Sequence, residues 1–207
     1  MKTINKTFVT IALLTAAILG VSSNAVAQKK VNIKALFWML PADALPEYLP
    51  QSDKQGMESH IIVCDYKNAY LELGGGQFTW EMCYWNLKDG RKLVAVNRNF
   101  ETGPLLRFFY YENEKLTEDE DYNLFENISI KLEDFIDVSK LNPDIIKKLR
   151  KNVESFKYII YYKLPRKGTS LKLRIDHEAV TEDFKSITYE TFKELTIKWV
   201  NEKWMKQ

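Results

Sequence analysis

The sequence predicts an α+β fold: a single domain dominated by an antiparallel β-sheet, with a few short helices. Three observations support this prediction. From His60 onward the apolar residues recur with a period of two, as in strands whose side chains point to opposite faces. Turn residues such as Asp89-Gly90 separate these segments. Helical spacing of apolar residues, or a typical helix start, occurs in short stretches near 31–40 and 143–152. Phe192, Leu195 and Trp199 also fit a helix, but the β-branched residues and Asn201-Glu202 favour a terminal hairpin over 194–200 and 203–206.

The first 27 residues have the features of a secretory signal peptide. Two lysines make the start basic, an apolar run covers residues 8–19, and small residues close the segment at 25–27. The run is too short for a stable membrane anchor, which is the alternative, and no Cys follows it where a lipoprotein signal needs one. We expect cleavage after Ala27 and a periplasmic or secreted protein, residues 28–207, with no membrane span after signal removal.

Removal of this segment leaves a chain without net charge. It takes two of the 30 basic residues and no acidic ones, so 28 basic residues balance 28 acidic ones. Such a chain has no overall field to attract nucleic acid or anionic lipid, and we expect no nucleic-acid partner. Residues 28–207 suffice for one domain with a sizeable core.

Apolar spacing and turn residues place the elements of this domain. Helical spacing before the first of three prolines predicts a helix at about 31–40, then a short helical turn near 43–49 and a loop over 50–59. A proline at the first helical position predicts a short helix over 143–152. Strands are expected at 60–66, 69–73, 78–87, 92–100, 105–112, 156–164, 170–175, 194–200 and 203–206.

Asp89-Gly90 also predicts how the strands on either side of it pair. A two-residue type I′ turn would place Lys88 opposite Arg91. A shift of one residue would change every opposed pair. The expected pairs are Trp85 with Val94, Cys83 with Val96 and Glu81 with Arg98.

Cys64 and Cys83 are the two cysteines of the sequence. In an exported protein an even pair suggests a disulfide, and strand pairing could bring the two together. Two separate buried thiols are the alternative, because the sequence alone does not place the α-carbons within bonding distance.

The sequence lacks the common patterns of catalytic and metal sites. It contains no G-x-S-x-G, S-x-x-K, H-E-x-x-H, C-x-x-C or phosphate-loop pattern. The acidic run 118–121 lacks the glycine and final glutamate of an EF-hand, and we expect a solvated turn there. His177 is expected to be an exposed side chain at a strand end. We therefore predict no catalytic residues, no metal site and no cofactor, although a carboxylate pair whose separation depends on the fold stays an alternative.

Aromatic residues occur on both faces of the predicted strands 78–87 and 105–112. Two apolar faces mean either that helices cover the second face or that this face is an exposed platform. The helices at 31–40 and 143–152 would supply the cover. In the platform alternative a protein or glycan partner would bind to an aromatic surface. Its candidate residues are Trp80, Tyr84, Tyr110 and Tyr111.

Two segments resemble small exported proteins of unknown function from Bacteroidetes. Residues 35–49, ALFWMLPADALPEYL, are similar to their opening F-x-x-M-P-x-x-L-x-P-x-L. Residues 92–111, KLVAVNRNFETGPLLRFFYY, are similar to their later apolar strand, Gly-Pro turn and aromatic strand. The leader ending NAVAQ is also common in that phylum. The resemblance implies a periplasmic or secreted, sheet-rich accessory protein, and it carries over no functional residues.

Together these observations favour an exported, non-catalytic protein that binds a protein or glycan partner. A secreted carboxylate-dependent hydrolase and a structural envelope component are the alternatives. A hydrolase predicts a concave pocket where at least two carboxylates with shifted pKa values converge. A binding protein predicts exposed aromatic rings without that convergence.

Overall fold

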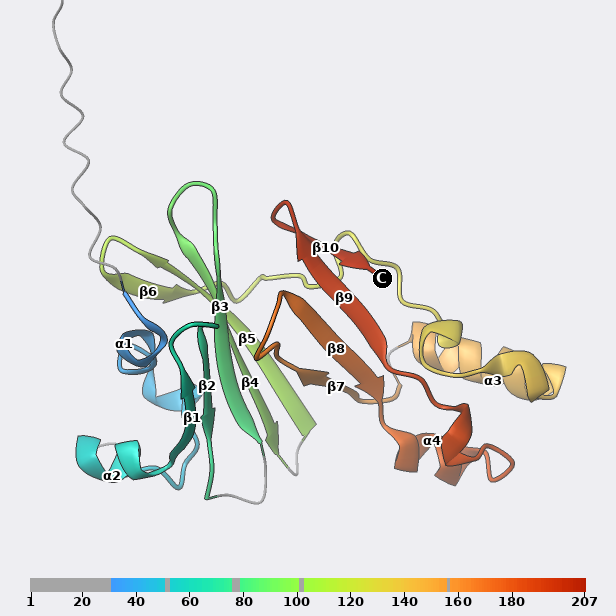
Figure 1. Ribbon diagram of the computed structural model, residues 1–207. Coiled ribbons are helices and arrows are strands. Elements are labelled where there is room, and N and C mark those ends of the chain that lie inside the picture. The colour runs from blue at the N-terminus through green and yellow to red at the C-terminus, as the bar shows by residue number, and fades with distance from the viewer. Residues whose placement is uncertain (1–30, 51–52, 76–78, 101–102, 156) are drawn as a thin grey trace, which may run out of the picture.

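Two antiparallel β-sheets pack against each other through a shared hydrophobic core. The predicted signal peptide, residues 1–27, and its cleavage after Ala27 lie outside the described residues. The computed structural model describes residues 31–207 except for 51–52, 76–78, 101–102 and 156 (Figure 1).

The large sheet is a meander of six strands within the described residues. Each strand pairs with the next one in the sequence, so the order in space is the order in the chain (Figure 1). Short connections of this kind follow from turn residues placed between alternating apolar segments. The strands are β1 (Ile61–Asp65), β2 (Tyr70–Leu73), β3 (Trp80–Asn86), β4 (Lys92–Phe100), β5 (Gly103–Glu112) and β6 (Lys115–Glu118).

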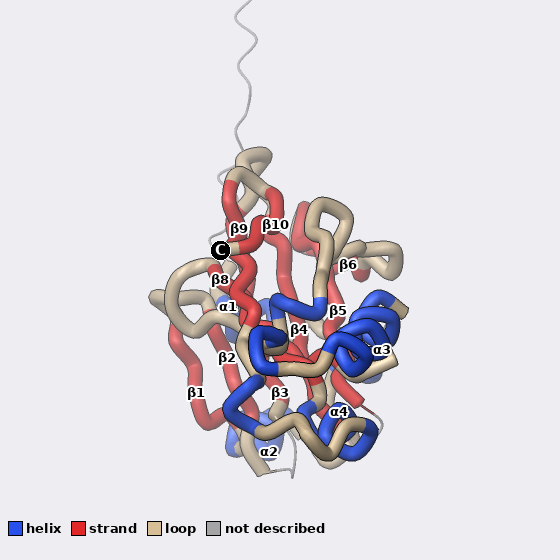
Figure 2. The backbone as a smooth tube through the Cα atoms, turned by 90° about the vertical axis from the view of Figure 1, so that its right-hand side faces the viewer, coloured by secondary structure: helices blue, strands red, loops and turns tan. Residues whose placement is uncertain are grey.

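The small sheet contains the later strands of the chain, in the order β10-β9-β8-β7. The terminal hairpin predicted over 194–200 and 203–206 is confirmed, because its two segments pair as β9 and β10. Figure 2 views the molecule from the side of this sheet. The strands are β7 (Ile160–Lys163), β8 (Ser170–Ile175), β9 (Leu195–Val200) and β10 (Lys203–Lys206).

The helices are short, as the sequence predicts. The predicted α+β fold class, dominated by antiparallel sheet, is confirmed. Of the four α-helices in the described part of the chain, two, α2 (Lys54–Ser59) and α4 (His177–Asp183), were not predicted. Residues 54–59 form a helix instead of a loop, because the Asp53 side chain accepts the Gln55 N–H at its start. His177 begins another helix and does not end a strand, because the Asp176 side chain caps that helix. The helices are α1 (Ile33–Phe37), η1 (Ala42–Ala44), α2 (Lys54–Ser59), η2 (Leu132–Asp134), η3 (Val138–Lys140), α3 (Pro143–Glu154), α4 (His177–Asp183) and η4 (Tyr189–Thr191).

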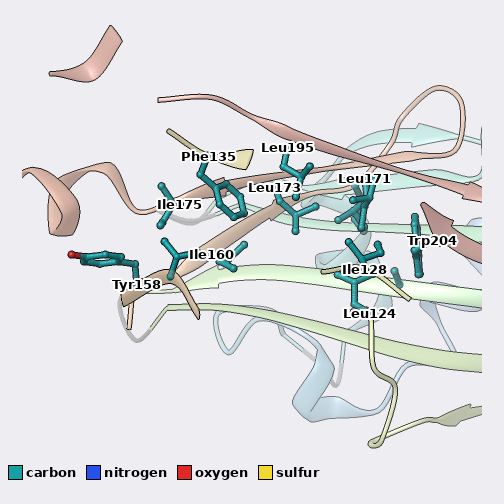
Figure 3. Close-up of a cluster of buried hydrophobic side chains, with 14 of the residues drawn as sticks. Leu124, Ile128, Phe135, Tyr158, Ile160, Leu171, Leu173, Ile175, Leu195 and Trp204 are labelled. Atoms are coloured by element: carbon teal, nitrogen blue, oxygen red, sulfur yellow. The ribbon is translucent and has the colours of Figure 1, made fainter. Parts of the chain in front are cut away.

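The large sheet separates two hydrophobic cores. On one face α1 and η1 cover apolar side chains of β2 to β5, which confirms the prediction that the helix near 31–40 covers an aromatic face. On the other face lies the small sheet, with α3 contributing Leu149 and Val153 to the core. Figure 3 shows this second core, in which Leu171, Leu173 and Leu195 of the small sheet meet residues from the middle of the chain.

Polar contacts fasten the helical cover to the sheet. The Trp80 indole N–H donates to the Ala44 carbonyl at 2.9 Å, and Arg98 Nη1 donates to the Asp43 carbonyl at 2.9 Å. Arg107 forms an ion pair with the Asp43 carboxylate at 3.2 Å. The segment that follows α1 is therefore fixed on the sheet by hydrogen bonds as well as by apolar packing.

The register predicted for the β3–β4 hairpin is wrong by one residue. The Leu87 N–H donates to the Arg91 carbonyl and the Gly90 N–H donates to the Leu87 carbonyl. The loop therefore contains three residues, with Gly90 at φ 92°, instead of the two of a type I′ turn. The observed pairs are Trp85 with Leu93, Cys83 with Ala95 and Glu81 with Asn97.

The disulfide considered for Cys64 and Cys83 is not formed, and both thiols are free. Cys64 is paired with Leu71, and Cys83 is paired with Tyr70. Because neighbouring residues of one strand point to opposite faces, the two cysteines lie on opposite sides of the large sheet. Cys64 packs against the core under α1, and Cys83 belongs to the core between the sheets.

A buried carboxylate joins the two sheets. Glu81 is 6% exposed, and its Oε1 accepts the Leu164 N–H at 2.6 Å and the Asn97 amide N–H at 2.9 Å. The same Asn97 Nδ2 donates to the Tyr162 carbonyl at 2.8 Å. Side chains of β3 and β4 thus satisfy backbone groups of β7 and of the residue that follows it.

We expect Glu81→Ala to lower the free energy of unfolding by about 3 kcal/mol, because it leaves the Leu164 N–H and the Asn97 amide without their acceptor. Glu81→Gln keeps an acceptor oxygen of the same reach and should lose only about 1 kcal/mol. Urea unfolding followed by circular dichroism measures both. Equal losses in the two variants would contradict the role given to the acceptor.

Candidate functional site

A concave pocket opens where the β9–β10 hairpin meets β5 and the loop after β6. Its volume is about 390 Å³. We call it the aromatic pocket, because four aromatic side chains line it together with acidic and amide side chains. These aromatic side chains are Tyr110, Tyr122, Trp199 and Trp204.

Contacts between the rings hold the pocket in shape. Trp199 and Trp204 are opposed partners in the terminal hairpin, and their ring centroids lie 4.9 Å apart. The Trp204 indole N–H donates to the Tyr122 hydroxyl at 2.8 Å, and the Tyr122 ring stacks on Phe108 at 3.9 Å. Trp204 also meets Trp85 of the large sheet edge to face at 5.1 Å. The wall is therefore fixed before any ligand arrives.

Three of the four rings keep accessible surface. Trp204 is 4% exposed and lies at the base of the pocket wall, whereas Tyr110, Tyr122 and Trp199 are half-buried. Burial raises the pKa of the Tyr122 hydroxyl. The hydroxyl therefore stays protonated near neutral pH, and the pocket presents neutral aromatic surface.

The rim of the pocket is polar. Its acidic side chains include Asp119, Asp121 and Glu126, and the amides Asn123 and Asn127 lie beside them. These groups offer hydrogen-bond acceptors next to the rings.

A hydrogen bond joins the β9–β10 turn to the β3–β4 loop beside the aromatic pocket. The Glu202 carboxylate, in the β9–β10 turn, accepts the backbone N–H of Lys88 in the β3–β4 loop. This hydrogen bond ties the terminal hairpin to the large sheet beside the pocket.

The aromatic platform, which was the alternative to a face covered by helices, is not present as one surface. Trp80 and Tyr111 are 2% and 3% exposed and lie in the core under α1 and η1, where Tyr84 is half-buried beside them. Tyr110 points to the opposite face and lines the aromatic pocket. The four residues separate because side chains alternate along β3 and β5.

Tyr122, Trp199 and Trp204 were missed as site residues. For Trp199 and Trp204 the sequence does contain a signal, the two-residue turn Asn201-Glu202 between them. Asn201 and Glu202 adopt φ values of 50° and 62°, as in a type I′ turn, and such a turn places Trp199 opposite Trp204. Tyr122 lies in a loop, and no local pattern marks its contact with the hairpin.

A second concave site, which we call the inter-sheet cleft, has a volume of about 350 Å³. It lies between β2, β3 and β4 of the large sheet and β7 and β8 of the small sheet. At its floor the Tyr70 hydroxyl lies 3.0 Å from Glu72 Oε2 and 2.9 Å from Glu81 Oε2. A hydroxyl carries one proton, so both contacts are hydrogen bonds only when one carboxyl group is itself protonated.

Glu81 is the group that burial favours for this proton. Loss of water around the side chain raises the pKa of Glu81, and the N–H groups of Leu164 and Asn97 oppose that shift only in part. When Glu81 carries this proton, it donates to the Tyr70 hydroxyl, which then donates to Glu72; when Glu81 is ionised, the Tyr70 hydroxyl donates to one of the two carboxylates.

The remaining predicted groups do not converge on a reactive centre. His177 packs against the rings of Phe192 at 4.2 Å and Tyr189 at 4.6 Å, and partial burial lowers the pKa of its imidazole. Across the described ranges there is no cluster of three or more His, Cys, Asp or Glu side chains that could hold a metal ion. In the same part of the chain, no helix has the length and apolar character needed to span a membrane.

The fold and the two concave sites define a class: an α+β protein of two packed antiparallel sheets, with an aromatic pocket and a polar cleft at their interface. No protein-family model matches the sequence, and no curated protein matches it. A domain of an uncharacterized protein from Porphyromonas gingivalis W83 is similar in structure, with a TM-score of 0.50 and 11% identity. The match covers 86% of this chain and 98% of that domain.

This likeness shows a shared fold alone, because 11% of the aligned residues are identical. The similar domain comes from a Bacteroidetes bacterium, the phylum whose small exported proteins the sequence resembles.

The raised pKa of Glu81 predicts how stability depends on pH. Well below the ordinary glutamate value of 4.5 the carboxyl is protonated in both folded and unfolded chains. As pH rises from there through the raised folded pKa, the unfolded chain releases its proton first, and the stability that this proton provides is lost. We therefore expect wild type to lose stability relative to Glu81→Gln, which does not titrate.

Urea unfolding of both proteins between about pH 4 and about pH 8 measures this difference. A difference that stays constant, or that moves in favour of wild type as pH rises, would show that the pKa of Glu81 is not raised.

Proposed function

We propose that this protein is an exported, non-catalytic binding protein that holds a glycan in the aromatic pocket. The observation that carries the proposal is the pocket itself, in which rings from β5, the terminal hairpin and the loop after β6 surround a concave surface. A sugar ring has an apolar C–H face that packs on aromatic rings, and hydroxyl groups at its edge that need polar partners. The aromatic pocket offers both kinds of surface.

The lining favours a glycan over a flat protein surface. The partly exposed rings Tyr110, Tyr122 and Trp199 lie inside a hollow, where a sugar unit fits and a flat partner makes little contact. The rim carboxylates Asp119, Asp121 and Glu126 accept hydrogen bonds from hydroxyl groups and repel anionic groups. We therefore expect neutral or amino sugars to bind better than acidic ones.

Export is part of the proposal and is supported by the leader pattern of residues 1–27. A glycan ligand suits that compartment, since the cell envelope and its surroundings are rich in polysaccharides.

The hydrolase alternative has less support. Glu72 and Glu81 meet at the Tyr70 hydroxyl in the inter-sheet cleft, as two converging carboxylates should. Glu81, however, is 6% exposed, and both of its oxygens already contact protein groups. A general acid has to direct its proton at the substrate, and Glu81 directs its oxygens at the protein. A purely structural envelope component needs neither concave site.

We expect the mature protein to be stabilised by a neutral envelope glycan, because binding to the folded state raises the melting temperature. A thermal-shift screen against purified peptidoglycan fragments and neutral and acidic oligosaccharides measures this. Trp199→Ala should reduce the affinity for the binding glycan about tenfold or more by removal of a ring surface. No stabilisation by any glycan, or equal stabilisation by acidic ones, would overturn the proposal.

Matched variants separate binding from stability. Trp199 also packs on Trp204, so Trp199→Ala alone can act through the fold. Asn127→Ala removes an exposed rim amide and should weaken binding without a change in melting temperature. Tyr189→Ala, a change at a ring that is 69% exposed and does not line the pocket, should leave binding unchanged.

A further inference from the structure

The inter-sheet cleft has walls of opposite charge. The wall from the large sheet contributes two carboxyl groups, Glu72 and Glu81, and no basic residue. The wall from the small sheet contributes Lys163, Lys172 and Arg174. Glu194, which precedes β9, also lines the cleft. Apart from Glu194, the charges are thus sorted by sheet across a space of about 350 Å³.

Several of these charges already have partners within the protein. Lys172 forms an ion pair with Glu194 at 2.6 Å. The Arg174 guanidinium lies 5.4 Å from the centre of the Tyr161 ring. Glu81 is held by the groups that join the two sheets. Apart from Glu81, two charged residues of the lining have neither an ion pair nor a ring contact among the described residues, whereas Arg174 keeps its positive charge beside Tyr161.

Those two residues are Glu72 and Lys163. Glu72 contacts the Tyr70 hydroxyl at 3.0 Å, which orients its carboxylate, and it forms no ion pair within the described ranges. Lys163 likewise has no ion-pair partner in that part of the chain. They face the same cleft from opposite walls without pairing with each other, so the space between them is open to a ligand that carries both charges.

An unsatisfied acceptor lies on the acidic wall. Asn99 lines the cleft and donates from Nδ2 to Thr79 Oγ1 at 2.8 Å. Its Oδ1 atom is buried and has no hydrogen-bond partner among the described residues. A buried carbonyl oxygen is unfavourable until it receives a donor, and an ammonium group supplies one.

We propose that the inter-sheet cleft binds a small zwitterion, a free amino acid or a short peptide. The ammonium group lies against Glu72 and Asn99 Oδ1, and the carboxylate lies against Lys163. The volume suits this size of ligand, because about 350 Å³ is at the lower end of ligand pockets, which span roughly 300–1,000 Å³. The cleft and the aromatic pocket share no lining residue, so this site goes beyond the glycan site and stands or falls separately.

Isothermal titration calorimetry of the whole mature protein tests the proposal with alanine, dialanine, N-acetyl-dialanine and dialanine amide. We expect alanine, dialanine or both to bind. The one that binds more tightly shows whether the site prefers a free amino acid or a short peptide. Blocking either end of that ligand should weaken binding about tenfold or more, the effect of one lost charge-assisted hydrogen bond. No binding of alanine or dialanine, or no effect of the blocking groups, overturns the proposal.

Two variants assign the charges. Glu72→Gln should weaken dialanine about tenfold and leave N-acetyl-dialanine unchanged, because the acetylated probe has no ammonium group. Lys163→Met should weaken dialanine and leave dialanine amide unchanged. A loss of equal size for free and blocked probes overturns the assignment, since it indicates a general change in the cleft.

The control variants are Glu182→Gln and Lys198→Met, which change exposed residues outside the cleft lining and should leave binding as in wild type. Melting temperatures of all four variants show whether the fold is kept. A tenfold loss of dialanine affinity in the Glu72 and Lys163 variants, with a wild-type melting temperature, supports the site. A loss no greater than that of the control variants overturns it.

Discussion

The backbone of β7 needs hydrogen-bond partners on the side that faces away from β8, and this need determines how the two sheets meet. No further strand of the described chain lies there. Instead the Glu81 carboxylate accepts the N–H of Leu164, and the Asn97 amide donates to the carbonyl of Tyr162. An unpaired edge is costly when buried and invites association when exposed. Two side chains thus substitute for a neighbouring strand and place β7 against the large sheet.

The difference in strand length between the sheets explains why sites form at their interface. β4 and β5 contain 9 and 10 residues, whereas β7 contains 4. At about 3.3 Å per residue, the small sheet cannot cover the full length of the large one. Side chains of the large sheet therefore remain accessible beside β7, at the cleft, and beside β10, at the aromatic pocket. On the other face, α1 and η1 leave Trp80 and Tyr111 almost fully buried.

The sequence predicts those features that depend on local chemistry. The period of two located most strands and the alternation of their faces, and a proline at the first helical position located α3. The predicted register of the β3–β4 hairpin is wrong because its loop holds one more residue than Asp89-Gly90 alone suggests. The residues of the aromatic pocket were not predicted for a different reason. The Trp204–Tyr122 hydrogen bond joins residues 82 positions apart, and no local pattern encodes a contact of that range.

The two sheets also differ in when they can form. The meander joins neighbouring segments through short turns, so the entropy of closing each loop is small. The contact between Leu164 and Glu81 closes a loop of 83 positions, and it contributes no stability until β3 is in place. Synthesis from the amino end releases the strands of the large sheet before β7. The strands of the large sheet therefore precede the last third of the chain, and the contact between Leu164 and Glu81 depends on both segments being in place.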